Sequence, residues 1–355
     1  MLTESVPALR ALLIVVLLAG LQGCGTLYLA QAAGGQWHLL RARRPLGAVI
    51  ADPHTPAALR ERLRSVEEAR DFAVSELHLP DNRSYRTYAD IKRRYVVWNV
   101  VAAPEFSVEP QRWCFPIAGC VAYRGYFSEK RAREFAAKLA VDGYDVTIGG
   151  VPAYSTLGKF ADPVVSTMMR YGDNELAAII FHELAHQLLY VEDDSEFNEA
   201  FATTVEDVGL ERWLKLRHQP ERLQEFRKED ADERAFVGLF VQGRARLAHL
   251  YASGIDRMQM RQQKAQIMGE LASQVRALQH QQGDDDYQVW LEEGLNNAQL
   301  ASIATYYECV PGFERLYAES ADDVQRFYDA ARALAREPRA KRHAVLCTQP
   351  DSGRR

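Results

Sequence analysis

The chain has 355 residues, of which 47% are hydrophobic and 26% charged, and its net charge at pH 7 is -5. These are ordinary globular values, with enough apolar side chain to bury one large core or two smaller ones. No basic stripe interleaved with aromatic residues is present, so we expect no nucleic-acid partner.

Residues 1–23 are more apolar than the rest of the chain, and their order of residues predicts a signal peptide. Arg10 precedes the apolar run 11–19, and small residues follow it, which is the order of a secretory signal. The run is short for a transmembrane helix, which needs roughly 20 apolar residues. The alternative interpretation is a degraded N-terminal anchor helix.

The end of this segment, Leu21-Gln22-Gly23-Cys24, resembles the lipobox of bacterial lipoproteins. The resemblance implies that Cys24 is the lipidated first residue of the mature chain. Acyl chains anchor a protein to a membrane without a spanning helix. Gly25 follows the cysteine, which by lipoprotein sorting rules favours the outer membrane. We therefore expect a protein of the bacterial cell envelope that faces the periplasm.

Four cysteines remain after Cys24, and an even number in an oxidising compartment predicts two disulfides. Cys114 and Cys120 flank a short turn-rich bridge and are the expected pair. Cys309 and Cys347 would then pair by elimination. The alternative is four unlinked buried thiols.

Residues 24–160 form the N-terminal section, in which helices precede a small α+β part. Near-helical spacing of apolar residues predicts the helices, and β-branched and aromatic runs predict the strands. The expected elements are helices over 26–44 and 55–78, strands over 95–102, 121–127 and 145–148, and a helix from Ser128 to about Asp142.

Residues 161–347 form a second section that is almost wholly helical from Asp173 onward, and 348–355 form a frayed tail. The charged stretch 221–280 predicts two long helices broken near Ser253-Gly254. The expected fold class is therefore α+β and predominantly helical. A small sheet precedes a long helical C-terminal part.

One helix of this second section carries the run His182-Glu183-Leu184-Ala185-His186. Asp173 or Asn174 is expected to cap the helix. Positions i and i+4 of a helix share one face, so both imidazoles can reach one Zn²⁺. Glu183 is rotated from the first histidine by about 100°. It can touch a water in the site without binding the metal, as a general base must. The alternative is two core histidines with a buried carboxylate, which would be costly without a metal.

A catalytic zinc keeps three protein ligands, so a third must come from a later element. Asp194 or Ser195 can cap a second helix, which we expect to end at Gly209. Glu199, near the start of that helix, is the expected ligand. Glu192, Glu196 and Glu206 compete with it.

Glu206 lies two turns beyond Glu199 and is the candidate to orient a ligating histidine. The alternative for Glu206 is a solvated charge.

The run HELAH followed by Asn198-Glu199-Ala200-Phe201-Ala202 resembles the gluzincin pattern, in which HExxH lies on one helix and a glutamate on the next. More narrowly, the chain resembles a bacterial family of predicted zinc aminopeptidases found as envelope lipoproteins. This likeness spans roughly residues 22–320, and a zincin-like fold is what it implies. Its main blocks are 28–32 with 35–36, 114–127, 150–158 with 160–163, and 296–298 with 304–306.

Two further features fit such a peptidase. A tyrosine hydroxyl often polarises the scissile carbonyl in gluzincins, and Tyr306 is the candidate here, with core packing as the alternative. Val151 to Leu157 precedes the motif helix and could be an edge strand that pairs with a substrate backbone; an ordinary loop is the alternative.

The sequence thus predicts zinc-dependent peptide hydrolysis, with Glu183 as general base and a peptide as substrate. Aminopeptidase action is the main expectation. A zinc endopeptidase of envelope proteins and a non-catalytic zinc-binding lipoprotein are the rivals. An intact Glu183 argues against the last, because a structural zinc site needs no base.

Overall fold

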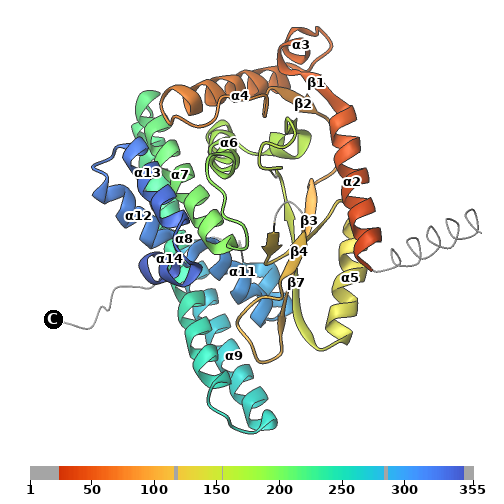
Figure 1. Ribbon diagram of the computed structural model, residues 1–355, viewed down its shortest axis with the longest axis vertical. Helices are drawn as coiled ribbons and strands as arrows, with labels where there is room; N and C mark the ends of the chain where they lie inside the picture. The colour runs from red at the N-terminus through yellow and green to blue at the C-terminus, as the bar shows by residue number, and fades with distance from the viewer. Residues whose placement is uncertain (1–23, 116–118, 154, 284–286, 348–355) are drawn as a thin grey trace, which may run out of the picture.

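The computed structural model describes residues 24–115, 119–153, 155–283 and 287–347. The expected signal peptide and the C-terminal tail lie outside these residues. The described chain is predominantly helical with small sheets, as the expected α+β class requires (Figure 1). No helix in these ranges is long and apolar enough to span a bilayer.

Three helices open the described chain: α2 (Cys24–Ala42), α3 (Leu46–Ala51) and α4 (Ala57–Ser75). Helix α2 was expected to run on to residue 44. It stops at Ala42 because the next three residues form β1 (Arg43–Pro45), which pairs with β2 (Thr87–Ala89). Strand β8 (Val164–Val165) completes this sheet beside β2.

The second sheet places β3 (Val97–Pro104) between β6 (Arg124–Tyr126) and β7 (Tyr144–Val151). Helix α5 (Glu129–Val141) packs on β3 and β7. Its N-cap is Ser128, whose side chain accepts a hydrogen bond from the Arg131 backbone N–H. This agrees with the expected helix start.

The single strand expected over 121–127 is wrong. Val121 ends β5 (Gly119–Val121), and two residues then leave regular structure before β6 begins. Strand β5 pairs with β4 (Trp113–Phe115) in a separate hairpin, where Cys114 lies directly opposite Cys120 and is joined to it by a disulfide. Val121, Tyr123 and Tyr126 favour a strand, and the poor strand former Gly125 lies inside β6 and not at the break, so propensity does not mark it.

The two helices of the motif region follow a 3₁₀ turn at Ser166–Arg170. Helix α6 (Asp173–Leu188) has Gly172 as its N-cap, so both expected caps, Asp173 and Asn174, lie inside its first turn. Helix α7 (Ser195–Leu216) is capped by Asp194, as expected.

Gly209 was expected to end α7, and this is wrong because the helix continues to Leu216. A Cβ at position 209 would lie 2.7 Å from the Phe181 ring and 2.8 Å from a Leu77 methyl group. The glycine therefore permits close packing of α7 on its neighbours and is not a helix stop.

The C-terminal part consists of helices. The two longest described helices are α8 (Pro220–Tyr251) and α9 (Arg257–Gln282). The chain reverses direction between them at Ser253-Gly254, as the sequence predicted, and Gly254 has a φ of 72°. Asn296 and Gln299 form a capping box at the start of α11 (Asn297–Tyr307). A disulfide joins Cys309 to Cys347, as the sequence predicted. The helices are α8 (Pro220–Tyr251), α9 (Arg257–Gln282), α10 (Gln288–Glu293), α11 (Asn297–Tyr307), α12 (Val310–Glu319), α13 (Val324–Ala335) and α14 (Arg339–Leu346).

The largest hydrophobic core joins the N-terminal helices to the motif helices. Phe181 of α6 packs its ring against Phe72 of α4 at a centroid distance of 5.5 Å, and Trp213 of α7 contacts both rings. Helix α11 packs on α7, β3 and β7. Helix α11 therefore connects the β6-β3-β7 sheet to α7, which in turn packs on α6 (Figure 1).

Candidate metal centre and active site

His182 and His186 lie one turn apart on α6, on the side that lines a pocket. The opposite side of the helix is anchored by the fully buried Ile180, Phe181 and Leu184. Because these apolar residues fix the rotation of α6, both imidazoles face the same point. Their Nε2 atoms are 3.1 Å apart.

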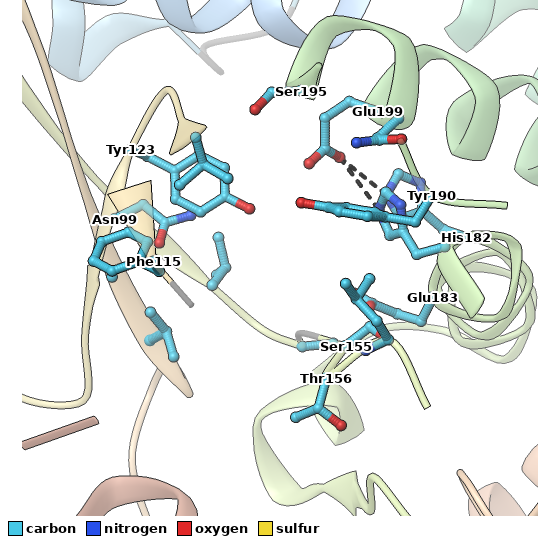
Figure 2. Close-up of a pocket in the computed structure, with 18 of the residues that line it drawn as sticks. Asn99, Phe115, Tyr123, Ser155, Thr156, His182, Glu183, Tyr190, Ser195 and Glu199 are labelled. Atoms are coloured by element: carbon cyan, nitrogen blue, oxygen red, sulfur yellow. Dashed lines mark hydrogen bonds and ion pairs between the residues drawn. The ribbon is translucent and has the colours of Figure 1, made fainter. Parts of the chain in front are cut away.

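Helix α7 brings Glu199 to the same point, as the sequence predicted. Its Oε2 atom lies 3.4 Å from His186 Nε2 and 3.5 Å from His182 Nε2 (Figure 2). The competing Glu196 points elsewhere, to Arg112 at 2.9 Å and Arg339 at 3.2 Å. Glu192 is exposed. The packing of α7 on α6 thus selects one glutamate of the expected set.

The spacing of these three donor atoms fits a tetrahedral metal ion. With metal–ligand bonds of about 2.0–2.1 Å, the edges of a tetrahedron measure roughly 3.3–3.4 Å. The three observed separations are 3.1, 3.4 and 3.5 Å. Three residues that are mostly buried and carry two imidazoles and a carboxylate therefore form a group compatible with a metal.

Glu206, the sequence candidate to orient a histidine, contacts His182. Its Oε2 atom lies 2.9 Å from His182 Nδ1. A carboxylate on Nδ1 fixes the ring orientation and leaves Nε2 as the ligating atom. Burial opposes protonation of His182, but the hydrogen bonds that the protonated ring donates to Glu199 and Glu206 outweigh it and raise its pKa well above the usual value. The carboxylates of Glu199 and Glu206 therefore stabilise a positive charge at this point.

Glu183 lines the pocket beside the triad and is 9% exposed. Burial is the main cause that raises the pKa of this carboxyl to about 8. Burial also opposes ionisation of Glu199, but the neighbouring histidines lower its pKa to about 2. The two glutamates therefore differ in their pKa: Glu199 stays ionised beside the histidines, whereas Glu183 binds a proton more readily.

Three tyrosines face this centre. Tyr306 of α11, the candidate from the sequence, lines the pocket, and Tyr190 after α6 and Tyr123 between β5 and β6 line it too. Figure 2 shows the Tyr123 hydroxyl directed across the pocket toward Tyr190 and the histidine–glutamate triad. Burial raises the pKa of Tyr306 and Tyr123 well above the usual value. Both hydroxyls therefore remain protonated hydrogen-bond donors.

Tyr123 and Tyr190 were missed as site residues by the sequence reasoning. Tyr123 lies inside the 114–127 block that carries the family likeness, which is the signal that could have identified it. Tyr190 follows His186 by four residues, but it lies just beyond the end of α6. Helical spacing therefore does not place its side chain.

The segment Val151 to Leu157 borders the same pocket. Val151 ends β7, which is an edge strand of its sheet. The expected strand does not continue beyond Val151 in the described residues. Instead, Asp162 accepts hydrogen bonds from the Thr156 backbone N–H at 2.9 Å and from its hydroxyl at 2.8 Å. The alternative interpretation, a loop, holds for the described residues 152–153 and 155–157.

A second acidic cluster, formed by Asp194, Glu196 and His343, is already neutralised. Arg342 donates to Asp194 at 2.7 and 3.0 Å, and His343 lies 2.7 Å from the other oxygen. Arg112 and Arg339 pair with Glu196. This network ties α14 to the start of α7 and leaves no net negative charge for a cation.

The fold and the site together define a helical α+β protein with a buried triad suited to a metal, beside a carboxyl in a pocket. Residues 27–346 match the model of the family described as "Putative aminopeptidase". The chain therefore belongs to that family, which indicates a peptidase. No curated protein and no solved structure gives a significant match.

Proposed function

We propose that this protein is a zinc-dependent peptidase and acts as an aminopeptidase. The observation on which the proposal rests is the convergence of His182, His186 and Glu199 at tetrahedral spacing, with Glu183 buried beside them. Two histidines and one glutamate are the ligand set of several catalytic zinc sites, in which the fourth position stays open. The family match supports hydrolysis of peptides.

Zinc, when bound, supplies Lewis acidity that polarises a carbonyl and acidifies a nearby water. Glu183 takes the proton of the attacking water and delivers it to the amine that leaves. Burial raises the pKa of Glu183, so its carboxylate is a stronger proton acceptor than an exposed one. Tyr306 and Tyr123 donate hydrogen bonds to the oxygen on which charge develops. Glu206 keeps His182 oriented throughout.

One observation favours an endopeptidase as the second candidate. An aminopeptidase must hold the α-ammonium group of its substrate, usually with a carboxylate. Among the described residues that line the pocket, the carboxylates are those of Glu183, Glu199 and Glu206. Each of these three carboxylates already has a role in the proposed mechanism. The pocket therefore offers no dedicated carboxylate for an ammonium group among its described lining residues, which favours an endopeptidase.

Metal removal and peptide choice test the proposal together. The purified protein should hydrolyse peptides, lose this activity when a chelator removes the metal, and recover it with one equivalent of zinc. Peptides with a free N-terminus and the same peptides with an acetylated N-terminus then separate the two candidates. Cleavage of free peptides alone supports an aminopeptidase, and cleavage of both supports an endopeptidase. Hydrolysis that is indifferent to chelation would rule out both.

We also propose that the mature chain begins at Cys24 and is anchored by lipid to the bacterial envelope, on the periplasmic side of the outer membrane. The support is the segment Leu21-Gln22-Gly23-Cys24 behind an apolar run. Metabolic labelling with a fatty-acid analogue should mark the wild type and leave Cys24→Ala unlabelled. Equal labelling of the two proteins would contradict the anchor.

A further inference from the structure

The pocket extends well beyond the metal centre. Its volume is about 610 Å³, within the range of small-molecule and peptide sites. The triad and Glu183 occupy one wall. The facing part, here called the apolar recess, is lined mainly by hydrocarbon and aromatic side chains from α2, β3 and the β4–β5 hairpin. Its main residues are Tyr28, Leu29, Ala32, Val97, Phe115 and Val121.

Formal charge is scarce in the pocket away from the metal centre. Among the described residues that line it, the charged side chain outside that centre is Lys159, which is exposed. Asn99 and Tyr123 supply neutral polar groups (Figure 2). A charged substrate side chain placed in the recess, away from the exposed Lys159, would therefore lose its hydration without meeting an opposite charge among the residues that line the recess.

The wall that α2 contributes is fixed in place. Gln31 donates from Nε2 to the Gly125 carbonyl at 3.3 Å and accepts from the Phe127 backbone N–H at 3.3 Å. Helix α2 also lies so close to Phe127 that a Cβ at Gly35 would come within 2.1 Å of its ring. The Tyr28 ring stacks on Phe115 at 5.0 Å. The recess is thus formed before any substrate arrives, which lowers the entropy lost on binding.

We propose that the apolar recess selects substrates that carry a large, uncharged hydrophobic side chain next to the bond that is cleaved. This inference rests on the proposed peptidase function and adds the substrate class to it. Burial of such a side chain against a preformed apolar wall is the source of the preference. Leucine and phenylalanine peptides are the substrates of this class, and lysine and aspartate peptides are excluded from it.

The first test compares matched peptides that differ at the residue beside the cleaved bond. With zinc-loaded wild type, kcat/KM for leucine or phenylalanine should exceed that for lysine or aspartate by about 10- to 100-fold. The Leu29→Glu variant should reduce the ratio of leucine to alanine peptides by about tenfold. Leu29 lines the pocket but is 45% exposed, so the fold should tolerate the change.

Leu216→Glu is the matched control, because Leu216 is 60% exposed at the end of α7 and does not line the pocket. Its peptide preference should equal that of the wild type. Phe160→Glu supplies a second variant at the rim, in a loop, and should act as Leu29→Glu does. Equal hydrolysis of leucine, lysine and aspartate peptides by the wild type would overturn the inference and leave the peptidase function standing.

A binding measurement makes the test independent of catalysis. N-phenyl-1-naphthylamine is neutral, and its fluorescence rises in apolar surroundings. Titrated into chelator-treated protein, it should bind saturably, about tenfold more weakly to Leu29→Glu and unchanged to Leu216→Glu. If no peptide is hydrolysed but this pattern appears, the proposed function fails and the recess remains. Equal probe binding by all three proteins would overturn the recess itself.

Discussion

Glu183→Gln should keep its metal and lose peptide hydrolysis by about 10³- to 10⁴-fold, at the upper end of the effect of losing a general base. Glutamine preserves the size of the side chain and an oxygen in the same place, but it cannot take a proton from water. The three candidate ligands are untouched, so zinc content should stay at the level of the wild type. Burial raises the pKa of Glu183 to about 8, so the uncharged amide should not lower the melting temperature.

Rates should be measured with metal content on the same samples. Glu192→Gln is the matched control, because Glu192 lies in the same region of the chain but is exposed. It should retain the activity of the wild type. If Glu183→Gln hydrolysed peptides at the rate of the wild type, another group would have to be the base, and the proposed mechanism would be wrong.

Removal of one ligand should have an effect at least as large. In Glu199→Ala, zinc should bind at least about 100-fold more weakly, because loss of a mere supporting partner of a ligand already costs about 10- to 100-fold. Activity at a fixed low zinc concentration should fall with it. His186→Ala should weaken zinc binding to a similar degree, because the Nε2 atom of His186 lies 3.4 Å from Glu199 Oε2 and belongs to the same candidate ligand set. Zinc titration of the metal-free proteins measures both effects.

Glu196→Ala separates the ligand from its neighbour in sequence. Glu196 lies one turn before Glu199 on α7 and is equally buried, but its carboxylate pairs with Arg112 and Arg339. Its loss should leave zinc affinity unchanged. The ligand assignment would be refuted if zinc affinity survived in Glu199→Ala and collapsed in Glu196→Ala.

Local rules were sufficient for much of this architecture. The i, i+4 spacing of His182 and His186 guarantees one shared face wherever the segment is helical. Caps such as Ser128 and Asn296 mark helix starts because their side chains accept backbone N–H groups within the next turn. The break at Gly254 is also local, since a positive φ is accessible to glycine without strain.

Other features depended on contacts between distant segments. Gly209 is compatible with a helix stop in sequence, and only the Phe181 ring beside it shows that the residue serves packing. The division of the 121–127 run into two strands depends on different partners, β4 for one and β3 for the other. Period-2 patterns describe which face a residue occupies and not which strand it joins.

The sequence by itself determined which groups are available to the candidate centre: two histidines and a carboxyl group on one helix, and a short set of glutamates on the next. The sequence favoured Glu199 but left three competitors open, and the packing of α7 on α6 places Glu199 at the histidines and directs Glu196 toward arginines instead. Tertiary structure also decided that Tyr123 and helix α2, at least 59 residues before the motif, enclose the pocket. Sequence distance carries no information on such proximity, since a packed core brings together side chains whose separation along the chain is arbitrary.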